Sequence, residues 1–236
     1  MKNKLDEVMG ENSEISLNDL MDKLGVNKDD LQFLCNTNPE MLLSLGGGNT
    51  CAKLGRAAAK VEGTPKGLCL SGVAEIHSKA GNYALFSLGL NQDAIAFKKE
   101  RPYQNANGGE VGYVILDKTD EYVSVSMKNP CYGKSDEKNT PEYNEINDFM
   151  SKIQPGITMT VDSISDSNLR TSKGNTPGGI YGHIAVSSNN TLNGGRVWAC
   201  DGKQTKFNLP RYGENIHLCF PKDCNVPRKT AEKLVE

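Results

Sequence analysis

One cysteine, one histidine and one acid follow each other along this sequence in contexts that suit a thiol hydrolase. Cys69 stands at the start of an amphipathic segment, His183 lies in the apolar segment YGHIAV, and Asp201 ends the segment VWACD. A thiol attacks a carbonyl as its thiolate, and the N–H groups at a helix N-terminus lower its pKa. A histidine can take the proton and return it to the leaving group, while an acid orients the ring. The three residues together would make a thiol hydrolase, and ordinary structural roles for the same residues are the alternative.

Among the seven cysteines, Cys69 fits a nucleophile best because it stands at the start of a predicted helix. Cys51 also lies near a predicted helix start and is the competing candidate, although a buried thiol in the core explains it as well. Cys219 and Cys224 could form a short disulfide if the protein works in an oxidising compartment. The same two cysteines could bind zinc together with His217, but their spacing matches no usual zinc finger.

The three histidines differ in their predicted surroundings. His77 follows Cys69 on the same predicted helix at a distance of two turns, which is too far for contact, and we expect it to be partly exposed. His217 alternates with apolar residues in NIHLCF and is expected on the solvent side of a strand. His183 lies in an apolar strand after a glycine that leaves room for a substrate backbone. It is therefore the histidine that we expect beside the nucleophile.

The position of Asp201 depends on how two predicted strands pair. If the hairpin between 181–186 and 196–201 is centred on residue 191 or 192, Asp201 lies opposite or diagonal to His183, on the same face as the ring. A register shifted by one residue would instead bring Cys200 to face the histidine and turn the acid away. A plain turn aspartate is the alternative interpretation.

The elements that must position these residues are helices first and strands later. Helical spacing and capping residues predict helices over 16–24, 27–35, 50–61, 68–80 and 141–153. Period-two segments predict strands within 110–116, 121–127, 156–164, 181–188, 195–202 and 215–222. The order predicts an α+β fold in which N-terminal helices pack on an antiparallel sheet.

The composition excludes some classes of partner. Basic and acidic residues nearly balance, 27 against 29, so no basic surface for nucleic acid is indicated. No apolar stretch reaches the roughly 18 residues that a membrane span needs. The first residues lack the apolar region of a secretion signal, so we expect synthesis in the cytoplasm, with export by a leaderless route left open.

Taken together, these segments resemble the papain-like peptidoglycan amidases of the CHAP and NlpC type, in particular the amidase effectors of type VI secretion. Gly67-Leu68-Cys69 is similar to the cysteine motif of that family, and Tyr181–Ala185 to its histidine motif, YGHIA. Cys200-Asp201 stands where the family often has a serine followed by an acid. The resemblance covers residues 50–220, with an insertion around 84–150.

The resemblance implies a papain-like fold and the hydrolysis of amide bonds in the stem or cross-link peptides of peptidoglycan. In this reading Cys69 attacks the carbonyl, His183 acts first as base and then as acid, and Asp201 orients the ring. No metal or organic cofactor is implied. The implied partners are a peptidoglycan peptide and, for a secreted toxin, an immunity protein that caps the cleft. The implied place of action is a bacterial periplasm or cell wall.

The glycines and tyrosine of the two motifs are implied to contact substrate. These residues are Gly67, Tyr181 and Gly182. The domain division that we expect is a helical N-terminal segment, 1–45, serving as a cap or docking region, and an amidase domain, 46–236. The helical pair of the first segment resembles that of wall-binding LysM modules and of a generic helix-turn-helix.

Two other functions stay open at this point. The chain could be a non-catalytic binding or structural protein that keeps the same fold. It could also use the same thiol chemistry as a protease or transamidase that acts on protein, because one triad serves several acyl-transfer reactions.

Overall fold

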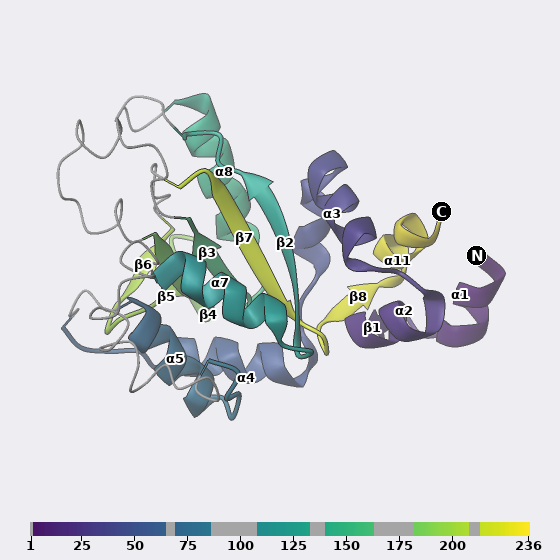
Figure 1. Cartoon of the computed structure of the whole chain (residues 1–236), viewed down its shortest axis with the longest axis horizontal. Coiled ribbons are helices and arrows are strands. Elements are labelled where there is room, and N and C mark those ends of the chain that lie inside the picture. Colours follow the sequence, from purple (N-terminus) through teal and green to yellow (C-terminus); the bar gives the residue numbers. More distant parts are fainter. Residues whose placement is uncertain (1, 65–68, 86–107, 133–139, 163–181, 208–212) are drawn as a thin grey trace.

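The computed structural model describes residues 2–64, 69–85, 108–132, 140–162, 182–207 and 213–236. It is an α+β structure built around a six-stranded sheet in which all the neighbouring strands are antiparallel (Figure 1). This confirms the predicted α+β class. Across the sheet the strands are β2 (Tyr122–Lys128), β7 (Asn215–Pro221), β3 (Thr158–Val161), β4 (His183–Leu192), β5 (Gly195–Ala199) and β6 (Gln204–Lys206).

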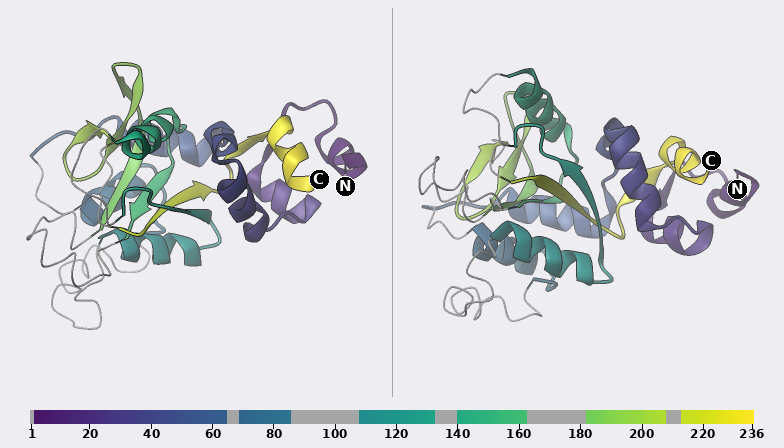
Figure 2. Two further views of the ribbon diagram at one scale, coloured as in Figure 1. Left: turned by 90° about the horizontal axis from the view of Figure 1, so that it is seen from above. Right: turned by 45° about the horizontal axis from the view of Figure 1, so that its top comes forward.

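Helices cover both faces of this sheet because its strands alternate apolar residues toward each side. The first face packs against α4 (Gly48–Ala58), α5 (Cys69–Lys79) and α7 (Gly108–Lys118), and the second against α8 (Pro141–Lys152) (Figure 2). Ile184 of β4 belongs to the apolar cluster of the first face, whereas its neighbour Ala185 belongs to that of the second. Period-two alternation in each strand thus separates two cores.

Local sequence signals place most of these elements correctly. Ser16 caps α2 (Leu17–Leu24), and Asn27 forms a capping box at the start of α3 (Lys28–Thr37), as predicted. The segment 110–116 is an exception: it was predicted as a strand and is part of α7. A short apolar segment does not reveal its period, and here only tertiary packing decides. The described part of the 84–150 segment also supplies edge strand β2 and helix α8, so it belongs to the main sheet domain.

The two ends of the chain form one small lobe. The N-terminal part supplies α1 (Lys2–Met9), β1 (Glu14–Ser16), α2, α3 and the short helix η1 (Pro39–Ser44), and the C-terminal part supplies β8 (Asn225–Pro227) and α11 (Arg228–Val235). Strands β1 and β8 pair antiparallel, and both termini lie on this side of the molecule (Figures 1 and 2). The structure thus differs from the predicted division, because the C-terminal residues join the segment 1–45.

Gln32 joins this lobe to the sheet. Its side-chain amide accepts a hydrogen bond from the Ser126 N–H at 2.7 Å and donates one to the Ser126 carbonyl at 2.6 Å. An edge strand has free N–H and C=O groups that invite pairing with another chain. Helix α3 therefore packs on edge strand β2 and satisfies the backbone groups of Ser126.

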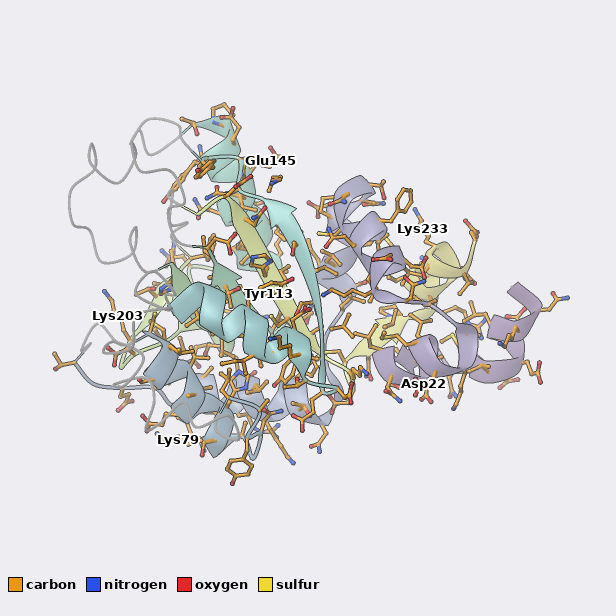
Figure 3. All side chains as sticks on the ribbon, viewed as in Figure 1. Asp22, Lys79, Tyr113, Glu145, Lys203 and Lys233 are labelled. Carbon is orange, nitrogen blue, oxygen red and sulfur yellow. A yellow bond between two sulfur atoms is a disulfide. The ribbon has the colours of Figure 1, made fainter. Side chains whose placement is uncertain are left out.

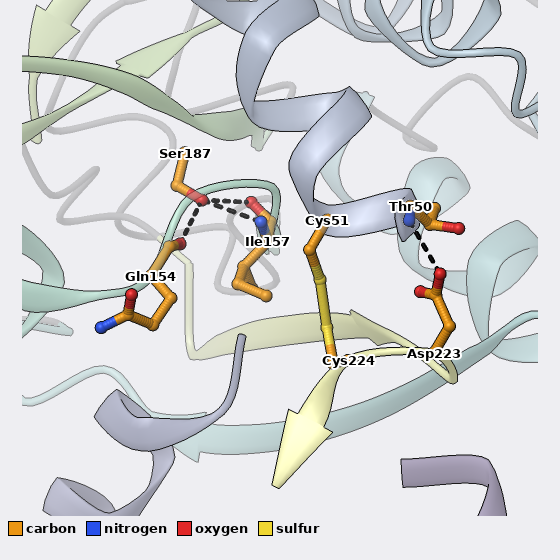
Figure 4. Close-up of a disulfide and its surroundings, with 7 residues drawn as sticks. All are labelled: Thr50, Cys51, Gln154, Ile157, Ser187, Asp223 and Cys224. Atoms are coloured by element: carbon orange, nitrogen blue, oxygen red, sulfur yellow. Dashed lines mark hydrogen bonds between the residues drawn. A yellow bond between two sulfur atoms is a disulfide. The ribbon is translucent and has the colours of Figure 1, made fainter. Parts of the chain in front are cut away.

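A disulfide between Cys51 and Cys224 ties the start of α4 to the turn before β8 (Figure 4). It rules out the possible disulfide between Cys219 and Cys224, since Cys219 is a buried free thiol. It also removes Cys51 as a competing nucleophile. Because Cys224 is bonded to Cys51, the possible zinc site of His217, Cys219 and Cys224 is excluded as well. Within the described ranges, no group of three metal-binding side chains is found.

None of the described helices is long and apolar enough to cross a membrane.

Candidate active site at the start of helix α5

The candidate nucleophile, Cys69, is the first residue of α5 and is partly buried. Backbone hydrogen bonds from Ile184 and Leu70 reach its thiol, and the backbone of Asp201 lies close by. Ile184 is the residue after the predicted base, His183. The fold therefore brings together the neighbourhoods of all three predicted catalytic residues, although they lie far apart in the sequence.

Burial changes the expected acidity of the Cys69 thiol. It raises the thiol pKa to about 11, and the nearby Cys200 and Asp201 add to the rise, whereas the hydrogen bonds from Ile184 and Leu70 lower it. The expectation of a lowered pKa at the helix start is therefore wrong for the structure as it stands. Desolvation of a thiolate outweighs the helix dipole here. Any nucleophilic role thus requires a base that takes the proton as substrate binds.

His183, the predicted base, is neutral at pH 7. Burial lowers its pKa to about 4. His183 is paired with Val161 of β3. Its side chain therefore points to the face of the sheet opposite to that of Ile184. The backbone N–H groups of a strand point along the plane of the sheet. Because the Ile184 N–H reaches the Cys69 sulfur, this sulfur lies beside β4, near the plane of the sheet, and not on the face that the helices cover. Within the described residues, the structure records no hydrogen bond from the His183 ring.

The pairing of β4 with β5 differs from the predicted register. Val186 pairs with Ala199, a bulge follows between Ser187 and Thr191, and the turn lies at Asn193-Gly194 rather than at 191 or 192. Continuing this register places Asp201 opposite Ile184. The side chain of Asp201 is then directed toward α5 and Cys69. The predicted register is wrong because the two-residue turn shifts the pairing by an odd number of residues, whereas the bulge adds two residues to β4 and leaves the facing unchanged. Asp201 is therefore on the face of the sheet opposite to the His183 ring, and its orienting role stays a prediction.

Gly72 holds α5 against the segment that contains Asp201. A Cβ atom at position 72 would lie 2.6 Å from the Asp201 Cα and 2.7 Å from its backbone nitrogen. Gly72 is one helical turn after Cys69, so this contact sets how closely the sulfur approaches the acid. Only glycine permits the approach, because the colliding atoms belong to the backbone.

We therefore expect Gly72→Ala to displace the start of α5 and to lower any Cys69-dependent activity by at least tenfold. The matched control is Ser71→Ala on the same helical turn. Circular dichroism and the rate of substrate cleavage provide the measurement. Equal activities of the two folded variants would show that the contact between α5 and Asp201 does not matter.

The residues implied to bind substrate are described only in part. Gly67 and Tyr181 lie outside the described residues. Gly182 is buried, and its φ of +58° is in the left-handed region, where glycine carries little strain. The chain turns at this glycine directly before His183 and β4.

The other two histidines are both buried, contrary to the sequence-based expectation. His77 is 0% exposed and hydrogen-bonds Thr158 at 3.0 Å and the Tyr122 hydroxyl at 3.3 Å. His217 is 5% exposed and contacts Ser126 and Asp162. The sequence did indicate that His217, Ser126 and Asp162 lie on or beside strands. It did not indicate which of these strands pair, so it could not predict the contact.

A comparison with protein-family models, with curated proteins and with solved structures finds no match for this chain.

Proposed function

We propose that this chain is a cysteine hydrolase with a papain-like fold that cleaves amide bonds in peptidoglycan peptides. The observation that carries the proposal is the position of Cys69: it opens a helix whose Gly72 packs against the backbone of Asp201, and its thiol accepts a hydrogen bond from the residue after His183. The similarity of the motifs around these residues to those of the peptidoglycan amidases gives the substrate class.

The proposed reaction uses acyl transfer in two steps. The Cys69 sulfur attacks the amide carbon while its proton passes to the neutral His183 ring, which must first move from the opposite face of the sheet to reach it, and the ring then gives the proton to the departing amine. Water hydrolyses the thioester with His183 as base. The backbone N–H groups at the start of α5 stabilise the negative oxygen of the tetrahedral intermediate. In the structure the thiol and the ring are both neutral at pH 7, which suits proton transfer during attack rather than a preformed ion pair.

The disulfide supports a place of action outside the cytoplasm. Disulfides persist in oxidising compartments and are rare in the cytosol. The Cys51–Cys224 bond therefore favours delivery to a periplasm or cell wall, where peptidoglycan is accessible. A secreted toxin of this kind would require a dedicated inhibitor in the cell that makes it.

A non-catalytic wall-binding protein is the second candidate. The raised pKa of the Cys69 thiol and the separate face of His183 favour it, because neither prepares a thiolate. So does the lobe formed by β1, β8 and the α2–α3 pair, because the sequence of this helical pair resembles that of wall-binding modules.

The test is to incubate purified sacculi with the wild-type protein, with Cys69→Ala, and with the control Cys200→Ala, and then to identify released fragments by chromatography and mass spectrometry. We expect release by the wild type and the control, and a loss of at least 10³-fold in Cys69→Ala. The fragment masses name the bond that is cut. Release that persists in Cys69→Ala would overturn the thiol mechanism. Binding to sacculi without release by any folded protein would favour the second candidate.

A further inference from the structure

A row of side chains crosses the sheet on the face covered by α7. Ser126 of β2 pairs with His217 of β7, His217 pairs with Thr160 of β3, and Thr160 pairs with Ile184 of β4. Residues that are paired in register lie on the same face of a sheet. Asp162 follows Thr160 by two positions and lies on that face too. The first half of this row is polar, and the proposed mechanism does not use it.

Three of these side chains form a continuous hydrogen-bonded chain. The Ser126 Oγ is 2.6 Å from the His217 Nδ1, and the His217 Nε2 is 2.8 Å from the Asp162 Oδ1. The Asn215 side chain donates to the other Asp162 oxygen at 2.8 Å. A nucleophile bonded to a base, and a base bonded to a third group that orients it, is the arrangement that activates a hydroxyl.

The charges fix the direction of these hydrogen bonds. Burial raises the pKa of Asp162, but hydrogen bonds from His217 and Asn215 outweigh it and hold this pKa below its usual value. Asp162 is therefore a carboxylate at neutral pH and can only accept, so the His217 Nε2 carries the proton. In the neutral ring the Nδ1 is then an acceptor, and the Ser126 hydroxyl donates to it. This is the tautomer that a general base needs.

The surroundings hold the base and the nucleophile rigidly. The Tyr113 ring stacks on the His217 ring with centroids 3.8 Å apart and planes 14° apart, and Figure 3 shows Tyr113 on α7. Gln32 bonds both backbone groups of Ser126, which itself is partly exposed. Among the described residues, the buried Thr160 hydroxyl next to His217 has no hydrogen-bond partner. A bound ligand or water would satisfy such a group.

From this geometry we propose that Ser126 is a second nucleophile, activated by His217 and Asp162, which accepts the acyl group of a carboxylic ester. The Ser126 oxygen bonds to the ester carbon while its proton passes to the His217 Nδ1. The ring then protonates the departing alcohol as the bond between that alcohol and the acyl carbon breaks. Water attacks the acyl-serine with the same ring as base, releasing the acid and restoring the hydroxyl.

This site is independent of Cys69. Ser126 lies on β2, and the Cys69 sulfur lies beside β4, with β7 and β3 between them. At about 4.8 Å per strand interval the two nucleophiles are roughly 15 Å apart. The serine site can therefore be tested in a Cys69→Ala protein, and its failure would leave the proposed amidase function untouched.

The test uses a fluorophosphonate probe on the Cys69→Ala protein, read by intact mass and peptide mapping. Attack of Ser126 on phosphorus releases fluoride and leaves one probe per chain. We expect that label on Ser126, its absence in Ser126→Ala, and labelling at least 10²-fold slower in His217→Gln. The matched control is Ser124→Ala, a buried serine on the same strand that hydrogen-bonds Cys219 and not the histidine.

Hydrolysis of p-nitrophenyl acetate by the same variants gives a second readout, with the same order of rates expected. Thermal melts followed by circular dichroism show which variants are folded. A folded Cys69→Ala protein that takes up no probe, or that labels equally fast with His217→Gln, would overturn the proposal. The triad would then be a buried polar network that holds β2, β7 and β3 in register.

Discussion

Replacing Cys224 with serine should lower the free energy of unfolding by about 2 to 5 kcal/mol. The bond to Cys51 closes a loop with a sequence separation of 173 residues, so its loss frees a long segment in the unfolded chain. Both cysteines are buried, which leaves a serine hydroxyl in an apolar site. The bond also joins the lobe of the chain ends to α4, and this junction is where we expect unfolding to begin.

Urea unfolding followed by circular dichroism measures the effect. Cys51→Ser should be as destabilising as Cys224→Ser, and the double variant should resemble either single one, because both remove the same bond. Cys35→Ser is the matched control, since Cys35 is buried but is not part of a disulfide. Wild-type protein treated with a reductant should approach the double variant. A double variant within about 0.5 kcal/mol of wild type would contradict a stabilising role for this bond.

Acidification from pH 6.5 to pH 4 should cost about 3 kcal/mol of stability through His77 alone. Burial lowers the pKa of this histidine from 6.5 to about 4, although the Asn82 side chain partly opposes the shift. Between these two pH values the unfolded chain binds a proton that the folded chain does not. The stability is therefore complete above pH 6.5 and falls as the pH decreases toward 4.

The same direction holds for His183, whose pKa is also lowered to about 4. Asp162 contributes at lower pH, because its folded pKa lies below the ordinary value of 3.8. Urea unfolding at several pH values between 6.5 and 4 gives the slope for the wild type, His77→Gln and His183→Gln. Each variant should show a shallower decline than the wild type, by a similar amount, because both pKa values are lowered to about 4. An unchanged slope in His77→Gln would show that this ring does not set the acid sensitivity.

Signals between neighbouring residues predicted much of the fold. The caps Ser16 and Asn27 and the proline at the start of α8 satisfy orphan backbone groups within one turn, so the sequence alone indicates where those helices begin. Period-two alternation likewise indicates where strands lie. The segment of α7 was mistaken for a strand because its glycine and apolar residues fit either period until Gly112 packs on Ile184.

The residue types that could carry thiol chemistry, and their order Cys69, His183 and Asp201, were determined by the sequence itself. Tertiary structure decided where they lie: the turn at Asn193-Gly194 set the register that turns Asp201 toward α5, His183 points to the other face of the sheet, and burial raised the pKa of the thiol. The disulfide partner of Cys51, Cys224, was likewise determined by the tertiary structure alone. The physical reason is that register, burial and cross-links depend on contacts between distant segments, whereas caps and periodicity depend on contacts within one.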